Sequence, residues 1–552
     1  MSIVNIKGLN YTYPDEDEPA LKDINLKADK GEILLVLGTS GSGKSTLLKA
    51  ITGAVPNFYG GIIEGYIYIN EKSVKTISHR ERAHMISAVF QDPEKQIVMN
   101  TVHKEIAFSL ENIGVPEKQI KRRVFESLQF LNILDLTYKK TDELSGGEKQ
   151  KVELAACIAM NSEIIVLDEP TSQLDPQSAE ELIYLVKKIS SELGKTIIVA
   201  EQRVDKWFDA AEKIMVLEEG SIVFYGDRTE FYNTDFIDFM PQYLRIAKEL
   251  KFDSAMDFQS VRKKLENHDI FFSDCIAADC NENDDTEKSS SIFNMFKRKK
   301  EENEYLKLKN VSVAYHSNIA LNEININFEK NKFYTILGEN GAGKSTLLKS
   351  IVKLVPYKGS ITYIGRSLQK INSYDIAKVI GYVSQNPNDY ISKDTVYEEI
   401  KFTLDNFKID DSSRIESILK DFKIYQYKDK NPRDLSGGEK QRLAIASVLV
   451  MNPEILLLDE PTRGLNYSNK KELGHMLRKF VDSGRTLIMI THDIDFAADF
   501  SDDILLLING ELVQYGNKRE VLKEGMYYTS TVHKLAGYRD VYTLDELKGC
   551  IK

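Results

Sequence analysis

The sequence predicts an α/β protein built from two copies of one module. Short runs that are apolar on both faces alternate with helix-patterned segments, which is typical of buried parallel strands. Each copy places a glycine-rich loop between such a run and a helix, and the same later motifs follow in the same order. The loop lysines stand 300 residues apart and the Leu-Ser-Gly-Gly-Glu motifs stand 291 residues apart. A near-constant offset over several motifs indicates an internal repeat.

The expected elements follow from these patterns in chain order. In the first copy we expect strands at residues 3–9, 21–28, 33–37, 164–167 and 196–200, with a helix beginning at 45–51. The second copy repeats three of these strands at residues 333–337, 455–458 and 486–490.

Composition and charge narrow the class of protein. A chain of 552 residues exceeds what one hydrophobic core usually organises, so two domains with connecting segments are expected. Apolar residues make up 42% and charged residues 28%, a balance typical of globular proteins. The formal net charge of −11 argues against bulk binding to nucleic acid, although it allows a local basic patch.

The cysteines and the N-terminal segment indicate a reducing, intracellular setting. Cys157, Cys275, Cys280 and Cys550 form no CxxC pair and favour free thiols, with a redox pair of Cys275 and Cys280 as the alternative. The N-terminus lacks the basic head and apolar stretch of a secretory signal. No apolar run approaches the ~18–20 residues needed to span a bilayer. We therefore expect any membrane role to come through a partner.

The chain divides into four expected segments. These are a first module at residues 1–235, a linker at 236–303, a second module at 304–525 and a C-terminal tail at 526–552. The linker begins with a part that can form helices. Residues 281–303 are charged and rich in Ser and Asn, so a flexible segment is expected there. Their basic tract at 297–300 is alternatively compatible with an anionic membrane surface.

The glycine loops predict two phosphate-binding sites. A glycine-rich turn between a strand and a helix aims backbone N–H groups at one point, which forms an anion site from main chain alone. The lysine of each loop adds a charge on the β- and γ-phosphates, and the serine after it offers a hydroxyl to Mg²⁺. The loops comprise Gly38, Thr39, Ser40, Gly41, Ser42, Gly43, Lys44, Ser45 and Thr46, and Gly338, Glu339, Asn340, Gly341, Ala342, Gly343, Lys344, Ser345 and Thr346.

An acidic pair ends one apolar run in each copy. Asp168-Glu169 and Asp459-Glu460 each follow four consecutive apolar residues. The C-terminal end of a buried parallel strand faces the ligand in nucleotide-binding folds. We therefore expect the Asp to hold the Mg²⁺ shell and the Glu to polarise an attacking water. The alternative is a helix N-cap ahead of the proline that follows.

The Leu-Ser-Gly-Gly-Glu motifs at 144–148 and 435–439, each ahead of an Asp-Glu-Pro-Thr, resemble the signature of ATP-binding-cassette (ABC) ATPases. The resemblance covers both modules. It implies tandem P-loop ABC-type domains, each with a mixed or parallel core sheet, an antiparallel β subdomain and a helical signature subdomain. It also implies ATP and Mg²⁺ as cofactors, and an ATPase that sandwiches ATP between one cassette's phosphate loop and the other's signature.

The same resemblance assigns roles to further residues. Tyr13 and Tyr315 are expected to stack on adenine, with a core or surface tyrosine as the alternative. The signature contacts to ATP would come from Ser145, Gly146, Gly147 and Glu148, and from Ser436, Gly437, Gly438 and Glu439. The Mg²⁺ shells would be Ser45, Gln91 and Asp168, and Ser345, Gln385 and Asp459. The catalytic residues would be Glu169 with Gln202, and Glu460 with His492.

Two differences between the copies predict unequal sites. His492 stands where the family has its switch histidine, whereas the first copy has Gln202, which donates a hydrogen bond but has no cationic form. The resemblance also implies an aspartate that couples the two sites. The first copy has it as Asp175, whereas the second copy has Asn466 at that position. The site with Glu460 and His492 is therefore expected to hydrolyse ATP faster.

The segment that begins at Gln91 points to a group within the family. It reads Gln-Asp-Pro at 91–93, then Thr101-Val102 and Glu-Ile-Ala-Phe-Ser-Leu-Glu-Asn at 105–112. This resembles energy-coupling-factor (ECF) importers, and the second copy at 385–400 matches less well. The resemblance implies an integral membrane coupling subunit, a separate membrane substrate-binding subunit, no nucleic acid, and a peripheral place at the cytoplasmic face of the cell membrane. The implied substrate is a vitamin, a vitamin precursor or a metal ion.

Two other functions stay open at this point. Tandem cassettes also occur in ribosome-associated translation factors, which typically carry Asn-His-Leu-Asp after Asp-Glu-Pro-Thr. This chain has Ser-Gln-Leu-Asp at 172–175 and Arg-Gly-Leu-Asn at 463–466. The ATPase of an ordinary ABC importer is the second alternative.

Overall fold

The computed structural model describes residues 2–14, 16–172, 174–202, 204, 206–252, 257–267, 305–315, 318–537 and 539–550. Contacts divide the chain into two units, Met1–Arg245 with Phe252–Asp257, and Ile246–Lys251 with Phe258–Lys552. The flexible segment expected at 281–303 and the cysteines Cys275 and Cys280 lie outside the described residues.

Each unit has a six-stranded central sheet with the same strand order. In the first unit the order is β6 (Ile86–Val89), β7 (Ile164–Asp168), β8 (Thr196–Ala200), β3 (Ile33–Leu37), β9 (Lys213–Glu218) and β10 (Ser221–Asp227). In the second it is β16 (Ile380–Val383), β17 (Ile455–Asp459), β18 (Thr486–Ile490), β13 (Phe333–Leu337), β19 (Asp503–Ile508) and β20 (Glu511–Asn517). All pairs are parallel except β9–β10 and β19–β20 at one edge. The strands β3, β7 and β8 are buried throughout because both faces of the sheet are covered.

A second, antiparallel sheet packs near the first in each unit. It consists of β2 (Leu21–Asp29), β1 (Ser2–Thr12), β4 (Ile62–Ile69) and β5 (Lys72–Ser73), and of β12 (Asn318–Phe328), β11 (Leu306–Tyr315), β14 (Lys358–Tyr363) and β15 (Arg366–Ser367). Buried residues alternate along β2, as one covered face requires. One core cluster joins this sheet, the parallel sheet and α1 (Lys44–Thr52).

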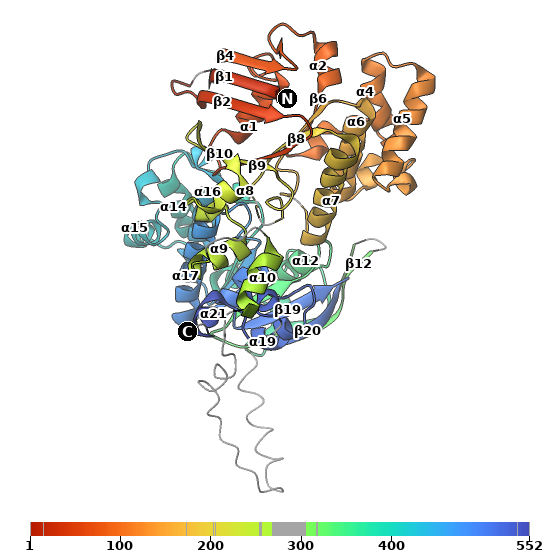
Figure 1. Ribbon diagram of the computed structural model, residues 1–552. Helices are drawn as coiled ribbons and strands as arrows, with labels where there is room; N and C mark the ends of the chain where they lie inside the picture. The colour runs from red at the N-terminus through yellow and green to blue at the C-terminus, as the bar shows by residue number, and fades with distance from the viewer. Residues whose placement is uncertain are drawn as a thin grey trace, which may run out of the picture. The chain divides into compact units, whose positions relative to one another are not determined.

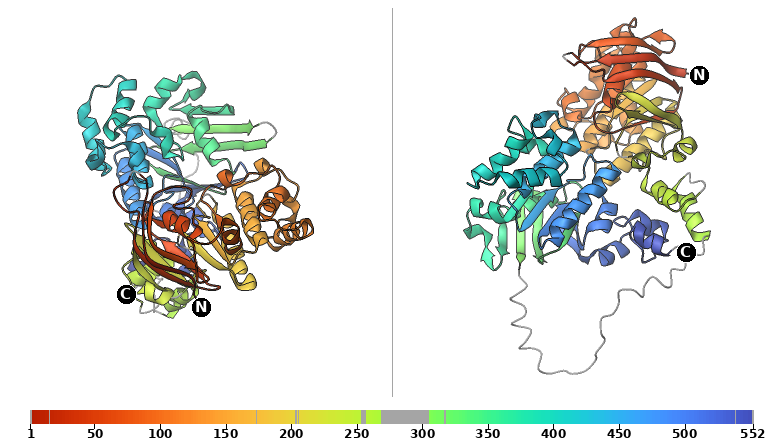
Figure 2. Two further views of the ribbon diagram at one scale, coloured as in Figure 1. Left: turned by 90° about the horizontal axis from the view of Figure 1, so that it is seen from above. Right: turned by 90° about the vertical axis from the view of Figure 1, so that its left-hand side faces the viewer.

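A group of helices forms the third part of each unit. Figure 1 shows α4 (Val102–Asn112), α5 (Glu117–Phe130) and α6 (Gly146–Met160) side by side in orange, and all three contact one another. In the second unit α14 (Val396–Asn406), α15 (Ser412–Asp421) and α16 (Gly437–Leu449) form a group distinct from the green strands (Figure 2). Together, the parallel core sheet, the antiparallel sheet and the helical group in each unit confirm the predicted fold class.

The remaining helices connect these parts or follow the cassettes. They are α2 (His79–Met85), α3 (Pro93–Gln96), α7 (Pro176–Leu193), α8 (Arg228–Tyr232), α9 (Gln242–Glu249), α10 (Phe258–Asn267), α12 (Lys344–Ile351), α13 (Ser373–Val379), α17 (Tyr467–Asp482), α18 (Ile494–Phe500), α19 (Lys518–Lys523), α20 (Thr531–Leu535) and α21 (Leu544–Cys550). Within the second unit α10 contacts α20, and Lys548 Nζ lies 2.5 Å from Glu249 Oε2. The C-terminal residues therefore pack against a segment that follows the first cassette.

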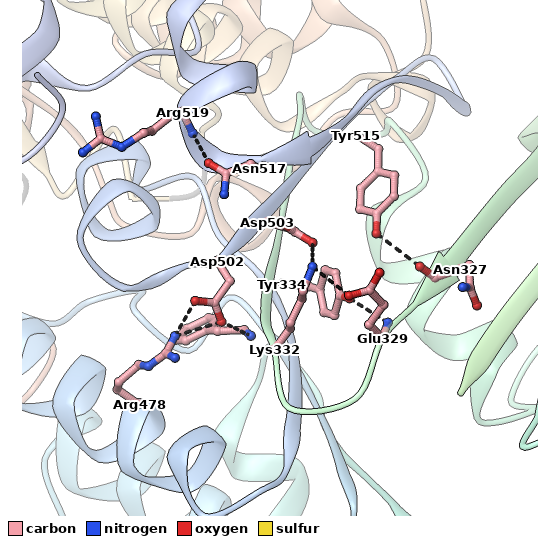
Figure 3. A network of polar contacts seen from close by, with 11 residues as sticks. Asn327, Glu329, Lys332, Tyr334, Arg478, Asp502, Asp503, Tyr515, Asn517 and Arg519 are labelled. Carbon is pink, nitrogen blue, oxygen red and sulfur yellow. Dashed lines mark hydrogen bonds and ion pairs between the residues drawn. The ribbon is translucent and has the colours of Figure 1, made fainter. Parts of the chain in front are cut away.

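A polar network fixes the start of β13 in the second unit (Figure 3). The backbone N–H of Phe333 donates to Asp502 Oδ2 at 2.8 Å, and Arg478 Nη1 contacts both oxygens of Asp502 at 2.9 Å. Lys332 Nζ donates to Asp503 Oδ2 at 2.9 Å. These contacts lie at the N-terminal end of the strand, opposite the end that leads into the glycine loop.

Candidate functional site

Each glycine loop joins a fully buried strand to the helix that the sequence predicts. The helix begins directly after Gly43, which has φ of 101°, or Gly343, which has φ of 93°. A Cβ on Gly43 would lie 2.8 Å from the carbonyl oxygen of Ala20, and a Cβ on Gly343 would lie 2.2 Å from that of Ala320. Only glycine accommodates both the left-handed backbone and this close approach.

The loop lysines fold back over their own loops. Lys44 Nζ donates to the carbonyl oxygens of Gly38 at 2.8 Å and Thr39 at 3.0 Å. Lys344 Nζ makes the equivalent bonds to Gly338 at 2.8 Å and Glu339 at 2.7 Å. Burial lowers the pKa of Lys44, and the nearby carboxylates of Glu169 and Asp168 oppose that effect. Each loop thus holds an ammonium group at the start of a helix, a position that suits a phosphate chain.

The predicted magnesium ligands meet at the end of β7. Ser45 Oγ donates to Asp168 Oδ1 at 3.0 Å, and Asp168 is buried. Burial raises the pKa of Asp168, with the Ser45 hydrogen bond opposing the rise. In the second cassette burial likewise raises the pKa of Asp459, and a hydrogen bond from Ser345 opposes it. A hydroxyl and a carboxylate side by side are the oxygen donors that Mg²⁺ prefers.

Glu169 contacts Gln202, predicted to act with it, and Gln91, predicted as a magnesium ligand. Its carboxylate accepts from Gln91 Nε2 at 2.8 Å and from Gln202 Nε2 at 2.6 Å, one amide on each oxygen. Its backbone has a positive φ of 47°, and its N–H donates to the carbonyl oxygen of Ala200 at 2.8 Å. The turn at the strand end therefore aims the carboxylate at the loop that follows β8.

Glu460 has the matching place in the second cassette but different partners. Gln385 Nε2 donates to Glu460 Oε2 at 3.2 Å, and His492 Nε2 lies 2.9 Å from Glu460 Oε1. His492 Nε2 also lies 3.1 Å from Asn340 Oδ1 in the glycine loop. Burial would raise the pKa of Glu460, but the hydrogen bond and charge of His492, with Arg463, bring it below its ordinary value. This carboxylate is held ionised, as a group that orients a water must be.

The signature residues form a second cluster in each cassette, at the start of α6 and α16. Ser145 Oγ accepts from the Glu148 N–H at 3.3 Å, and Glu148 Oε2 accepts from the Ser145 N–H at 2.8 Å. Ser436 and Glu439 form the same capping box. The glutamates therefore close the helix start, and the glycines after each serine leave first-turn backbone groups open to an anion.

The positions expected to couple the sites, Asp175 and Asn466, both cap the helix that follows. Asp175 Oδ1 accepts from the backbone N–H groups of Gln177 and Ser178 at 3.0 Å, and Asn466 Oδ1 accepts from that of Asn469 at 2.9 Å. Both residue types are good N-caps. The second cassette therefore keeps a capped start of α17, although it has Asn where the first cassette has Asp.

The two candidate adenine tyrosines have different surroundings. The Tyr13 hydroxyl lies 3.1 Å from Thr46 Oγ1, and its ring makes an edge contact with Tyr11 at 4.9 Å between centroids. Tyr315 ends β11 and is 45% exposed. Adenine stacking by either ring stays a prediction.

Glu201 is a residue of this site that the sequence patterns missed. It follows β8 directly, is only 1% exposed, and accepts a hydrogen bond from the backbone of Gln202 at 3.1 Å. A charged residue at the end of an apolar run, next to a predicted catalytic position, was the available signal.

Among the described residues, no helix combines the length and apolarity needed to cross a bilayer.

Comparison with protein-family models matches the ABC transporter family at residues 21–172 and 321–463. A Bacillus anthracis protein named as an ABC transporter ATP-binding protein is 35% identical over 538 residues, covering 96% of this chain and 94% of its own. One of the same description from Clostridium tetani is 38% identical, covering 79% of this chain and 95% of its own. The solved structure of cbiO1 from Clostridium perfringens, described as part of the ABC transporter complex cbiONQ, is 31% identical. It covers 46% of this chain and 96% of its own, with a TM-score of 0.40. The chain belongs to the ABC transporter family and is an ATP-binding, ATP-hydrolysing protein with two tandem cassettes.

Proposed function

We propose that this protein is the ATPase subunit of an energy-coupling-factor type importer for a vitamin, a vitamin precursor or a metal ion. The observation that carries the proposal is the segment from Gln91 to Asn112, which follows the pattern of those importers through Thr101-Val102 and Glu105-Ile106-Ala107-Phe108. The second copy follows it less closely.

The geometry of this segment supports docking of a partner. Glu105 is buried and its Oε2 accepts from the backbone N–H groups of Val98 at 2.9 Å and Met99 at 2.6 Å. These hydrogen bonds hold the backbone at Val98 and Met99 in place. The Val98 side chain is nevertheless 67% exposed, and that of Phe90 is 37% exposed. Apolar side chains presented on a fixed loop suit a helix of a membrane subunit.

Hydrolysis in this proposal uses an in-line water oriented by Glu169 or Glu460. Mg²⁺ would be held by Ser45, Asp168 and Gln91 in one site, and it would neutralise charge on the transferred phosphoryl group. Ser345, Asp459 and Gln385 would hold it in the other. The lysines and the backbone donors of the glycine loops would stabilise the same charge. The signature of one cassette would complete the ATP-binding site of the other. ATP binding would then close the two cassettes on each other, and hydrolysis would let them separate.

The two sites are proposed to be unequal. The site of Lys344, Glu460 and His492 hydrolyses ATP faster, and the site of Lys44, Glu169 and Gln202 more slowly. The contacts that support this are those of Glu460 with His492 and of Glu169 with Gln202.

The proposal assigns the ATPase domains to residues 1–235 and 304–525, the linker to 236–303 and the tail to 526–552. The partners are an integral membrane coupling subunit and a separate membrane substrate-binding subunit, and no nucleic acid. The protein would sit peripherally at the cytoplasmic face of the cell membrane and touch the membrane through these partners.

Affinity isolation of the tagged full-length chain from detergent-solubilised native membranes tests this proposal. We expect two multi-span membrane proteins to co-purify, and Val98→Asp to lose them while ATP binding is kept. Val223→Asp, at an exposed position of β10 in the same unit, is the matched control and should keep them. Capture of ribosomes, or of membrane subunits that work with an extracytoplasmic binding protein, would contradict the proposal.

A further inference from the structure

A buried carboxylate joins two loops beside the first hydrolytic site. Glu201 Oε1 accepts hydrogen bonds from the Thr171 backbone N–H at 2.8 Å and from the Thr171 hydroxyl, and its Oε2 accepts from the Gln202 backbone N–H at 3.1 Å. Trp207 Nε1 also lies 3.4 Å from Thr171 Oγ1. Thr171 belongs to the loop that carries Glu169, so Glu201 links that loop to Gln202.

The second cassette makes the same link in a weaker way. Thr491 occupies the place of Glu201, and its hydroxyl lies 2.9 Å from that of Thr462. The Thr491 hydroxyl also accepts from the Asp493 N–H at 3.0 Å. The pair Glu201-Gln202 thus replaces the pair Thr491-His492, and the carboxylate appears only in the cassette that lacks the histidine.

The difference in strength follows from the chemistry of the two links. A buried carboxylate is costly to place unless several donors satisfy it, and Glu201 accepts hydrogen bonds from the backbone and hydroxyl of Thr171 and from the backbone of Gln202. Hydrogen bonds to a charged acceptor are roughly twice as strong as those between neutral groups such as two hydroxyls. The loop of Gln202 is therefore held more firmly to the loop of Glu169 than its counterpart is.

We propose that Glu201 is a positioning residue for hydrolysis in the first cassette. It fixes the backbone of Gln202 against the loop of Glu169, so that Gln202 Nε2 stays on Glu169 Oε1 in a site that has no histidine. The inference rests on the proposed role of Glu169 in orienting the attacking water.

The test uses the full chain in its membrane complex and a photoreactive ATP analogue. Labelling trapped by vanadate reports turnover at each site, and labelling without vanadate reports nucleotide binding. Labelled peptides from the two glycine loops are identified by mass spectrometry. We expect Glu201→Ala to lower trapping at the first loop at least tenfold, and vanadate-free labelling at 4 °C to change less than twofold. Trapping at the second loop should stay within twofold of that in the unaltered protein. Glu201→Gln, which keeps the size and one acceptor, should give an intermediate loss and decides the matter if the alanine variant fails to fold.

Exchange of the whole pair distinguishes positioning from a merely structural role. Glu201→Thr combined with Gln202→His should recover at least half of the trapping that Glu201→Thr alone loses. Wild-type trapping in the first loop after Glu201→Ala, no trapping there in the unaltered protein, or no recovery by the pair would overturn the inference. Glu169→Gln must abolish trapping at the first loop. If it does not, the proposed role of Glu169 fails, whereas loss with Glu169→Gln but not with Glu201→Ala refutes this inference alone.

Discussion

Gln202 Nε2 lies 2.6 Å from Glu169 Oε1, at the place where the second cassette sets an imidazole against its glutamate. An amide and an imidazole both donate a hydrogen bond, but only the imidazole also takes a cationic form. His492 further contacts Asn340 in the glycine loop, 3.1 Å away. The two sites therefore place their glutamates alike and differ in the side chain that contacts the glutamate, an amide in one and an imidazole in the other.

Replacing the histidine should make the site that we propose to be faster resemble the one that we propose to be slower. In a Glu169→Gln background, which leaves the second site to hydrolyse ATP, we expect His492→Gln to lower turnover about tenfold. This is less than the roughly 100-fold or larger loss typical of removing an acid–base group or an electrostatic donor, because glutamine keeps a hydrogen-bond donor. The KM for ATP should change less than twofold, because an amide still donates from the same place. Steady-state ATPase assays measure both constants. Unchanged turnover would show that the imidazole has no special role.

A buried acid in the first cassette should make stability depend on pH. Glu153 on α6 is 3% exposed, and none of the described residues hydrogen-bonds to its Oε1. Burial, with repulsion from Glu105, raises the pKa of Glu153 to about 8. The second cassette has Ala444 at this position.

The sign of the effect follows from proton binding. Between the unfolded pKa near 4.3 and the folded value, the folded protein binds the extra proton, so stability falls as pH rises through this window. Glu153→Gln removes the penalty and should raise the Tm of the first cassette by a few degrees at pH 8, with little change at pH 5. Differential scanning calorimetry at both pH values measures this. Exposed Glu64→Gln is the control, and an equal shift at both pH values would refute the explanation.

The polar network at the start of β13 should contribute stability without touching nucleotide binding. Asp502→Ala removes the acceptor of the Phe333 N–H and of Arg478, which costs about 1–3 kcal/mol, reduced by the partial exposure of the pair. We expect a lower Tm for the second cassette and an ATP affinity within twofold of the unaltered protein. Exposed Asp410→Ala should change neither. A large loss of ATP affinity would contradict the separation between this end of the sheet and the glycine loop.

Much of the fold could be predicted because its signals are local. Apolar runs of strand length became β3, β7 and β8, and the glycine loops lead into α1 and α12. The motif order alone indicated that Ser45 and Asp168 share a site, and they hydrogen-bond across 123 residues of sequence. Parallel strands bring their C-terminal ends to one edge, which makes this inference safe.

The remaining features depend on tertiary contacts that no spacing encodes. Nothing in the sequence of the tail predicted α20 and α21, because Val532 and Leu547 find their cover only in the folded unit. The hydrogen bond between Glu201 and Thr171 joins residues 30 positions apart, and glutamate is a residue type that is usually exposed. Such contacts become visible only when both loops are in place.

The most direct test of the account compares Glu460→Gln with Glu169→Gln in the full chain bound to its membrane partners. Each change removes one carboxylate and keeps the shape of the side chain. The account predicts that Glu460→Gln lowers ATPase turnover at least tenfold, and that Glu169→Gln lowers it no more than about threefold. Equal losses in the two variants would contradict the claim that the cassettes hold unequal hydrolytic sites.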